Sequence, residues 1–308
     1  MKTLLVAAQS ESEDWAELLR AALPGRNVLT SAPPGDVPVA YAVVDRPEGG
    51  LLRRLPGLEV VLSLNAGVEH LLAGGEVPDG LPIVRMADDG MREGMLEWVT
   101  AHVLAWHRNL FAYRAAQAEG RWVQMPEKLA RERTVTVLGA GALGGAVAAR
   151  LATFGFETRA WSRSRRDIAG VTAFAGPAEF GAALHGADIL VSVLPLTAET
   201  ENLLDGAALA RLSRGAFVVN AGRGGHVVDG DLIAALDAGA VGGAALDVFR
   251  REPLPADHPF WTHPAILVSP HVAAPTQPLT AVAAIAESIR RHEHGEPLLH
   301  LVDRRLGY

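Results

Sequence analysis

The chain has 308 residues, of which 49% are hydrophobic and 20% charged, and its formal net charge is −7 at pH 7. This length is long for a single core and predicts two domains. The negative charge argues against a protein that binds the nucleic-acid backbone. No cysteine is present, so disulfides and thiolate metal sites are excluded. No stretch approaches the roughly 18–20 apolar residues of a membrane span, so we expect a cytoplasmic protein without a membrane partner. We also expect no bound metal.

Short apolar runs alternate with helix-length segments, which is typical of α/β proteins with parallel sheets. In the first part of the chain we expect strands near residues 4–8, 40–44, 60–64 and 83–85. A long helix is expected over about 93–119, because apolar residues recur there at three- and four-residue steps. These residues are Met95, Val99, Val103, Trp106 and Leu110.

A second series of elements follows. We expect strands near 135–138, 158–161, 189–194, 217–220, 244–248 and 266–269, and helices over about 142–154, 231–238 and 279–291. The predicted fold is α/β, with two Rossmann-like or flavodoxin-like parallel-sheet domains and a cleft between them. Residues 100–270 would form the dinucleotide-binding domain. Residues 1–99 and 271–308 would form a discontinuous substrate-binding domain.

Residues 139–144 read Gly-Ala-Gly-Ala-Leu-Gly, between an apolar run and a predicted helix. In this setting the pattern is a dinucleotide-binding fingerprint. Gly139 permits the tight turn, Gly141 lets the backbone approach a pyrophosphate, and Gly144 lets the helix pack close to the strand. The helix N-terminus, with Ala142 and Leu143, then offers N–H groups to the phosphates.

The end of the next predicted strand indicates which dinucleotide is preferred. Folds that prefer NAD carry an acid there, which binds the ribose 2′-hydroxyl. Here the strand is followed by Ser-Arg-Ser-Arg-Arg at 162–166, and no carboxylate occurs before Asp167. Guanidinium and hydroxyl groups suit a 2′-phosphate, so we expect NADPH as cofactor, with NAD possible but weaker. The predicted phosphate clamp is Ser162, Arg163 and Ser164, with Arg166 as an auxiliary. The alternative is that Arg165 and Arg166 only decorate a solvated turn.

Three later segments offer groups that hydride transfer to a 2-keto acid requires. Arg223 follows a predicted strand end, where ligands bind in such folds, and can bind a carboxylate with two hydrogen bonds. Glu252 follows the next strand, and His271 follows the last one. A protonated imidazole can donate a proton to the substrate oxygen, and a carboxylate can orient that imidazole. Each residue alone is ordinary, but their order after the dinucleotide turn favours catalysis.

The chain resembles the D-2-hydroxyacid dehydrogenase family, most closely its glyoxylate/hydroxypyruvate reductase A group. The resemblance covers nearly the whole chain and includes residues 139–144, 161–165, 194–195, 220–224, 246–249, 252–255, 269–271, 302–304 and 307–308. It implies NADPH-dependent reduction of small 2-keto acids, such as glyoxylate and hydroxypyruvate, to 2-hydroxy acids. It also implies that Arg223, Glu252 and His271 are catalytic and that Asp247 holds the nicotinamide carboxamide.

The resemblance implies further contacts as well. Leu194, Pro195, Ala221 and Gly222 would line the cofactor. Backbone N–H groups of Ala66, Gly67 and Val68 would bind the substrate carboxylate together with Arg223, because exposed amides in a turn form an anion nest. A homodimer is expected, with the helix at 93–119 as a plausible contact.

Two segments depart from the family pattern on the substrate side. Asp45 stands where the relatives carry an aromatic residue, and Leu64-Asn65 precedes the nest where a small residue is commoner. One alternative is therefore the same chemistry on a bulkier 2-keto acid. Another is a non-enzymatic nucleotide-sensing scaffold with the same fold, although the complete Arg–Glu–His set favours an enzyme.

Overall fold

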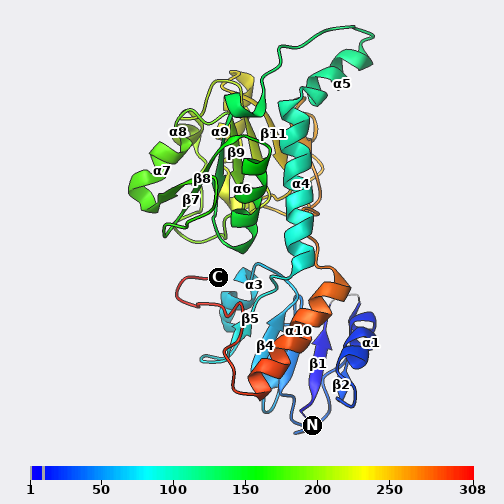
Figure 1. Ribbon diagram of the computed structural model, residues 1–308. Coiled ribbons are helices and arrows are strands. Elements are labelled where there is room, and N and C mark those ends of the chain that lie inside the picture. The colour runs from blue at the N-terminus through cyan, green and yellow to red at the C-terminus, as the bar shows by residue number, and fades with distance from the viewer. Residues whose placement is uncertain (1, 9–10) are drawn as a thin grey trace. The chain divides into compact units, whose positions relative to one another are not determined.

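The structure is a computed structural model that describes residues 2–8 and 11–308 (Figure 1). The chain divides into two compact units, one formed by Met1–Met91 with Thr276–Tyr308 and the other by Arg92–Pro275. Both boundaries differ from the predicted ones. Met95 and Val99 belong to the core of the second unit, and the backbone N–H of His271 donates to the Asp247 carbonyl within that unit (2.8 Å).

The first unit contains a five-stranded, fully parallel sheet of order β2-β1-β3-β4-β5, which is a flavodoxin-like order. Its strands are β1 (Leu4–Ala7), β2 (Val28–Leu29), β3 (Tyr41–Val44), β4 (Val60–Ser63) and β5 (Ile83–Val84). Its helices are α1 (Ser12–Ala22), α2 (Leu51–Arg54), α3 (Glu69–Leu72) and α10 (Pro278–Glu293), with a 3-10 turn η1 (Ala73–Gly75). The central strands β3 and β4 are buried at every residue, as expected for a parallel sheet covered on both faces.

The second unit contains a seven-stranded, fully parallel sheet of order β12-β11-β10-β9-β6-β7-β8. Its strands are β6 (Thr134–Leu138), β7 (Glu157–Ser162), β8 (Val171–Ala175), β9 (Ile189–Ser192), β10 (Ala216–Asn220), β11 (Val241–Leu246) and β12 (Ile266–Val268). Its other elements are α6 (Ala142–Thr153), α7 (Gly176–Leu184), α8 (Gly206–Leu209), α9 (Asp229–Asp237), η2 (Ala130–Glu132), η3 (Gly224–His226) and η4 (Pro259–Trp261). The two parallel sheets confirm the predicted fold class.

The predicted long helix is two helices, α4 (Asp89–His107) and α5 (Leu110–Ala118), so the expectation of one helix over 93–119 is wrong. Asn109 lies between them in the left-handed conformation, with φ of 58°. A helix cannot continue through this conformation, although asparagine tolerates it better than most residues. The apolar periodicity continues across the break and therefore conceals it.

The strand ends of the second sheet are aligned in register. One row of paired residues runs across it, made of Trp161, Leu138, Ser192, Asn220, Leu246 and Val268. The segments that follow these residues therefore leave the sheet along the same edge. The chain order reverses between β6 and β9, and parallel α/β sheets bind ligands beyond the carboxyl ends of the strands at such a point.

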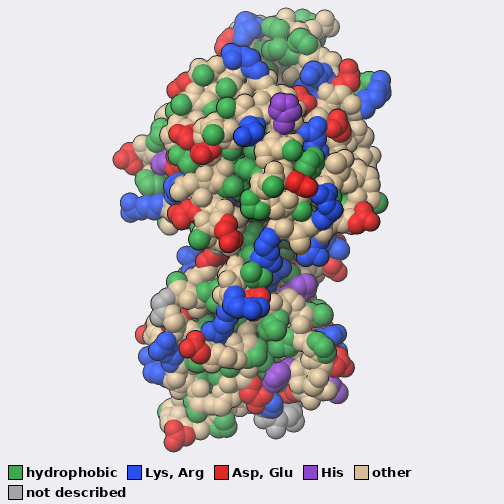
Figure 2. All heavy atoms as spheres, turned by 90° about the vertical axis from the view of Figure 1, so that its left-hand side faces the viewer, with side chains coloured by type: hydrophobic (Ala, Val, Ile, Leu, Met, Phe, Trp, Pro, Cys, Tyr) green, Lys and Arg blue, Asp and Glu red, His purple; other side chains and the backbone are tan. Residues whose placement is uncertain are grey.

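Within each unit, the face shown in Figure 2 carries basic and acidic side chains interspersed. Among the described residues, no helix is long and apolar enough to cross a membrane. Over the same residues, no three His, Asp or Glu side chains are grouped as potential metal ligands.

Candidate active site

The turn between β6 and α6 requires glycine at two of its three fingerprint positions. Gly139 has φ of 100°, a conformation that residues with a side chain rarely adopt. A Cβ atom on Gly144 would lie 1.7 Å from the Gly139 carbonyl oxygen and 2.6 Å from a Val193 methyl group. Gly144 therefore lets α6 approach the strand ends, as the sequence predicted.

The start of α6 fits a dinucleotide pyrophosphate. A Cβ atom on Gly141 would meet nothing within 4 Å, so the space beside this residue is open in the described structure. Gly141 is the N-cap of α6 and supplies no side-chain cap. The first N–H groups of a helix have no acceptor within it and favour an anion. Gly141 and Ala142 are exposed, so this backbone is accessible to a phosphate.

The segment after β7 contains the predicted phosphate clamp. Ser162 ends the strand, and its hydroxyl donates to the Ser164 carbonyl (2.8 Å), which closes a tight bend. Arg163, Ser164 and Arg166 are exposed. Arg165 instead pairs with both Glu179 oxygens (2.6 and 2.8 Å) and donates to the Ala173 carbonyl. The structure therefore gives Arg165 a local structural role, which differs both from a phosphate clamp and from simple decoration of a solvated turn.

The loops after β9 and β10 pack closely against the dinucleotide turn. Gly139 lies against the 193–194 backbone, where a Cβ would be 3.1 Å from the Val193 oxygen. A Cβ on Gly222 would be 2.8 Å from the Leu194 carbonyl oxygen, and the neighbouring Ala221 N–H donates to the Ser192 carbonyl (3.0 Å). These contacts bring three predicted cofactor-lining segments together.

Arg223 is half-buried on a loop that other side chains hold. The Asn220 amide donates to the Arg223 carbonyl (3.0 Å) and accepts from the Gly222 N–H (3.2 Å). The Arg223 N–H donates to Nδ1 of His226 (3.2 Å), and Nε2 of this histidine donates to the Pro195 carbonyl (3.2 Å). His226 is fully buried. Its bridging of these two loops was not recognised in the sequence.

Glu252 and His271 form a hydrogen-bonded pair. His271 Nδ1 lies 2.8 Å from Glu252 Oε2, and the other carboxylate oxygen, Oε1, accepts from the Phe249 N–H (2.9 Å). The His271 side chain is 47% exposed and that of Glu252 30% exposed. A carboxylate at Nδ1 fixes the ring and leaves Nε2 as the nitrogen that can face a substrate.

Asp247 shapes the turn that presents His271. Its Oδ1 accepts from the Ser269 hydroxyl (2.6 Å) and the Val272 N–H (2.9 Å), and its Oδ2 accepts from the Ala273 N–H (2.8 Å). The side chain is 1% exposed, and His271 adopts a left-handed conformation with φ of 56°. No sequence pattern indicates this structural role, and the predicted contact with a nicotinamide stays a prediction.

In the first unit, the predicted anion nest follows β4 as a short turn. The N–H groups of Ala66, Gly67 and Val68 donate no hydrogen bond to any residue that the structure describes. Val68 caps α3 without a side-chain hydrogen bond. Successive amides without an internal acceptor can bind a carboxylate, and the predicted contact of this turn with a substrate stays a prediction.

The two segments that depart from the family pattern contact each other beside this turn, through Asp45 and Asn65. Asn65 Nδ2 donates to Asp45 Oδ1 (2.7 Å), and His70 Nε2 donates to the Asp45 carbonyl (2.7 Å). The Asn65 carbonyl in turn accepts from the Met86 N–H (3.0 Å). Asp45 and Asn65 therefore act as one polar pair that fixes the start of the nest.

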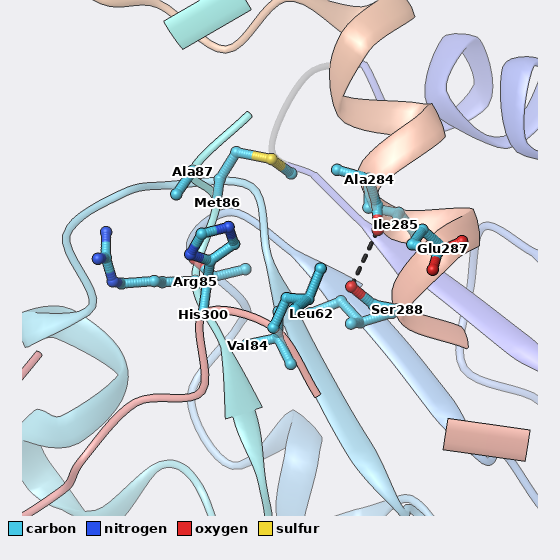
Figure 3. A pocket seen from close by; sticks show the side chains of 12 residues that line it. Leu62, Val84, Arg85, Met86, Ala87, Ala284, Ile285, Glu287, Ser288 and His300 are labelled. Carbon is cyan, nitrogen blue, oxygen red and sulfur yellow. Dashed lines mark hydrogen bonds between the residues drawn. The ribbon is translucent and has the colours of Figure 1, made fainter. Parts of the chain in front are cut away.

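A separate small cavity in the first unit lies between α10 and the ends of β4 and β5 (Figure 3). Ser288 lines it and donates to the Ala284 carbonyl (2.9 Å). Burial lowers the pKa of Arg85, and burial together with Arg85 lowers the pKa of His300. The volume of this cavity is about 70 Å³, well below the roughly 300 Å³ of small ligand pockets. None of the predicted site residues that the structure describes lines it, so we do not assign it to the active site.

Comparisons with known proteins identify the family of this chain. The model of the D-isomer specific 2-hydroxyacid dehydrogenase NAD binding domain matches residues 100–273. Glyoxylate/hydroxypyruvate reductase A from Klebsiella pneumoniae (strain 342) is 42% identical over 299 residues, which cover 96% of each chain. The protein of the same name from Escherichia fergusonii is 41% identical over an equal length and share of each chain.

Two solved structures are similar over essentially the whole chain. A D-isomer specific 2-hydroxyacid dehydrogenase from Xanthobacter autotrophicus Py2, in complex with NADPH and MES, has a TM-score of 0.94 and 41% identity, and covers 100% of this chain and 99% of that chain. The NADPH-dependent glyoxylate/hydroxypyruvate reductase from Sinorhizobium meliloti, in complex with NADP and sulfate, has a TM-score of 0.94 and 37% identity over 100% of both chains. The chain therefore belongs to the family of D-isomer specific 2-hydroxyacid dehydrogenases, which are NAD(P)-dependent enzymes.

Proposed function

We propose that this enzyme reduces small 2-keto acids, glyoxylate and hydroxypyruvate among them, to 2-hydroxy acids with NADPH. The observation that carries the proposal is the His271–Glu252 pair, with 2.8 Å between Nδ1 and Oε2, at the strand-end edge that also holds the glycine-rich turn. Relatives at about 40% identity that are named glyoxylate/hydroxypyruvate reductase A support the choice of substrate.

The proposed cofactor is NADPH rather than NADH. Arg163 is exposed directly after the strand end where NAD-specific folds carry an acid, and the nearest downstream carboxylate, Asp167, lies beyond the clamp. Ser162 and Ser164 form the bend that presents Arg163. Similar structures that contain NADPH or NADP support this choice.

In the proposed mechanism, each side chain has a distinct task. When bound, NADPH supplies the hydride for the keto carbon. His271, protonated, donates the proton on Nε2 to the carbonyl oxygen, and Glu252 holds the ring through Nδ1 and stabilises its positive charge. Arg223 binds the substrate carboxylate and polarises the carbonyl group. The turn at residues 66–68, with its successive N–H groups, is proposed as a nest for a carboxylate.

One experiment tests this function. Purified enzyme is mixed with NADPH or NADH and a series of 2-keto acids of increasing size, and NADPH oxidation is followed by absorbance. We expect glyoxylate and hydroxypyruvate with NADPH to give the highest kcat/KM. His271→Asn should keep NADPH binding but lose roughly 10²–10⁴-fold in kcat. Preference for a larger acid would favour the bulkier-substrate alternative, and binding of NADPH without turnover of any acid would favour the scaffold.

We also propose that the enzyme is a homodimer. Apolar side chains in and after α5 are exposed in the single chain, with Leu110 at 55%, Trp122 at 97% and Leu129 at 51%. Exposed large apolar groups gathered along one segment are typical of interfaces. Sedimentation of the wild type and of Trp122→Ser tests this. We expect a dimer that the substitution weakens, and a wild-type monomer at micromolar concentration would contradict the proposal.

A further inference from the structure

We propose that Arg250 is a positioning residue, which clamps the loop that carries Arg223 to the loop that carries Glu252. The inference deepens the proposed function and uses its catalytic residues. Arg250 lies between Asp247 and Glu252, and no sequence motif marks it as functional.

The guanidinium of Arg250 binds the neighbouring loop at several points. Its Nε donates to the Val227 carbonyl (3.0 Å). Its Nη2 donates to the same carbonyl, to the Gly225 carbonyl (3.3 Å) and to Oδ1 of Asn202. Asn202 binds the same loop independently, because its backbone N–H donates to the Gly225 carbonyl (2.8 Å). A planar guanidinium can present two donors in a fixed direction, whereas an ammonium group cannot.

The two loops meet through bare backbone at this point. A Cβ atom on Gly224 would lie 1.9 Å from the Phe249 carbonyl carbon and 2.3 Å from the Arg250 nitrogen. The first loop thus reaches the second only because residue 224 has no side chain. Directly beside this contact, the Phe249 N–H holds Glu252 (2.9 Å). A shift of one loop against the other would therefore move Arg223 relative to the Glu252–His271 pair.

Charged groups behind the clamp hold Arg250 in place. Asp229 Oδ1 lies 3.8 Å from Arg250 Nε, and Asp229 Oδ2 lies 3.5 Å from Nε2 of His258. Burial raises the pKa of the Asp229 carboxyl, and the charges of Arg250 and His258 oppose this effect. The Arg250 side chain is 34% exposed, so it is reached by solvent on one side while it binds the loop on the other.

The test uses Arg250→Lys and Arg250→Ala in the full chain, with Arg251→Ala as the matched control. Arg251 is the adjacent arginine, is exposed, and makes no hydrogen bond or ion pair with any residue that the structure describes. Displacing a substrate-binding group by about 1 Å can cost on the order of 10²-fold in rate. We expect both Arg250 variants to lose roughly 10–100-fold in kcat with glyoxylate, with the Kd of NADPH changed less than twofold.

Two readouts distinguish positioning from general damage. Millimolar ethylguanidinium should restore at least a third of the activity lost in Arg250→Ala, and should leave Arg251→Ala unchanged. Hydrogen exchange followed by mass spectrometry should show faster exchange over residues 223–228 in both Arg250 variants, and unchanged exchange over 134–138.

The exchange measurement needs no turnover, so it separates the two claims. Faster exchange over 223–228 in an enzyme that reduces no keto acid would refute the proposed function and leave the clamp standing. Unchanged exchange in both Arg250 variants would overturn the clamp, and so would a kcat equal to that of the wild type.

Discussion

Alanine substitutions in the turn between β6 and α6 distinguish an effect on NADPH binding from an effect on folding. The positions are Gly141, Gly144 and Gly145. The added atom is the same in each variant, but its surroundings differ. On Gly144 the Cβ would lie 1.7 Å from a backbone oxygen, on Gly145 its nearest contact would be 3.5 Å away, and on Gly141 nothing would lie within 4 Å. These distances predict three different outcomes.

Gly144→Ala should unfold the turn or displace it, because a backbone atom cannot rotate away as a side chain can. Overpacking typically costs about 1–3 kcal/mol, and sometimes more. Gly145→Ala should be tolerated and should gain up to about 1 kcal/mol, the usual advantage of alanine over glycine within a helix. Gly141→Ala should cost about 1 kcal/mol or less, since φ of −78° suits alanine and only a small N-cap preference is lost.

Urea unfolding and NADPH titration measure the two effects separately. We expect the unfolding free energies of Gly144→Ala and Gly145→Ala to differ by about 1–4 kcal/mol, the sum of the two terms above. Gly141→Ala should fold normally yet bind NADPH at least about 10-fold more weakly, because a methyl group would occupy the pyrophosphate position and weaken charged hydrogen bonds worth about 1.5–3 kcal/mol. Gly145→Ala should bind NADPH like the wild type. Normal NADPH binding by Gly141→Ala would refute the assignment of the turn.

Three further predictions concern charge. Arg163→Ala should weaken NADPH binding by about 1.5–3 kcal/mol and leave NADH binding nearly unchanged, as measured by calorimetry. An equal loss of affinity for both cofactors would exclude Arg163 as the phosphate clamp. Glu252→Gln keeps a hydrogen-bond acceptor beside Nδ1 of His271 but removes its charge, so kcat should fall by roughly 10-fold or more. A kcat equal to that of the wild type would contradict a role for the carboxylate in the pairing with His271. Burial lowers the pKa of His107, so the unfolded chain takes up the proton first as pH falls through about 6.5. The unfolding free energy should therefore fall as the pH is lowered below about 6.5, by at most about 1.4 kcal/mol per pH unit. His107→Gln should make this fall less steep. An equally steep fall in His107→Gln would assign the pH dependence to other groups.

Local patterns predicted most of the central elements of the fold. The apolar run before Gly139 became the inner strand β6, and the following helix begins at Ala142 because the glycine turn and the helix periodicity lie next to each other in the sequence. The two-residue strand β2 and the five-residue strand β8 were not predicted. β8 lies at the edge of its sheet and is fully buried at none of its residues, so it lacks the apolar run of a central strand.

The parts of the site that escaped prediction depend on contacts through space. Asp247 was predicted to face the cofactor, but its two oxygens bind residues more than twenty positions away in the sequence. Arg250 binds backbone carbonyls, and a carbonyl has no side-chain signature. The pairing of Glu252 with His271 was foreseen because their chemistry is complementary and both follow neighbouring strands.

The transfer of hydride to the keto carbon can be measured with NADPH that carries deuterium at the transferred position. The enzyme is incubated with this NADPH and hydroxypyruvate, and the product is analysed by mass spectrometry and chiral chromatography. We expect one deuterium at C2 of a single enantiomer of the hydroxy acid, of the D configuration, and almost none formed by His271→Asn in the same time. NADPH oxidation without deuterium at C2, or undiminished product from His271→Asn, would contradict the proposed reaction.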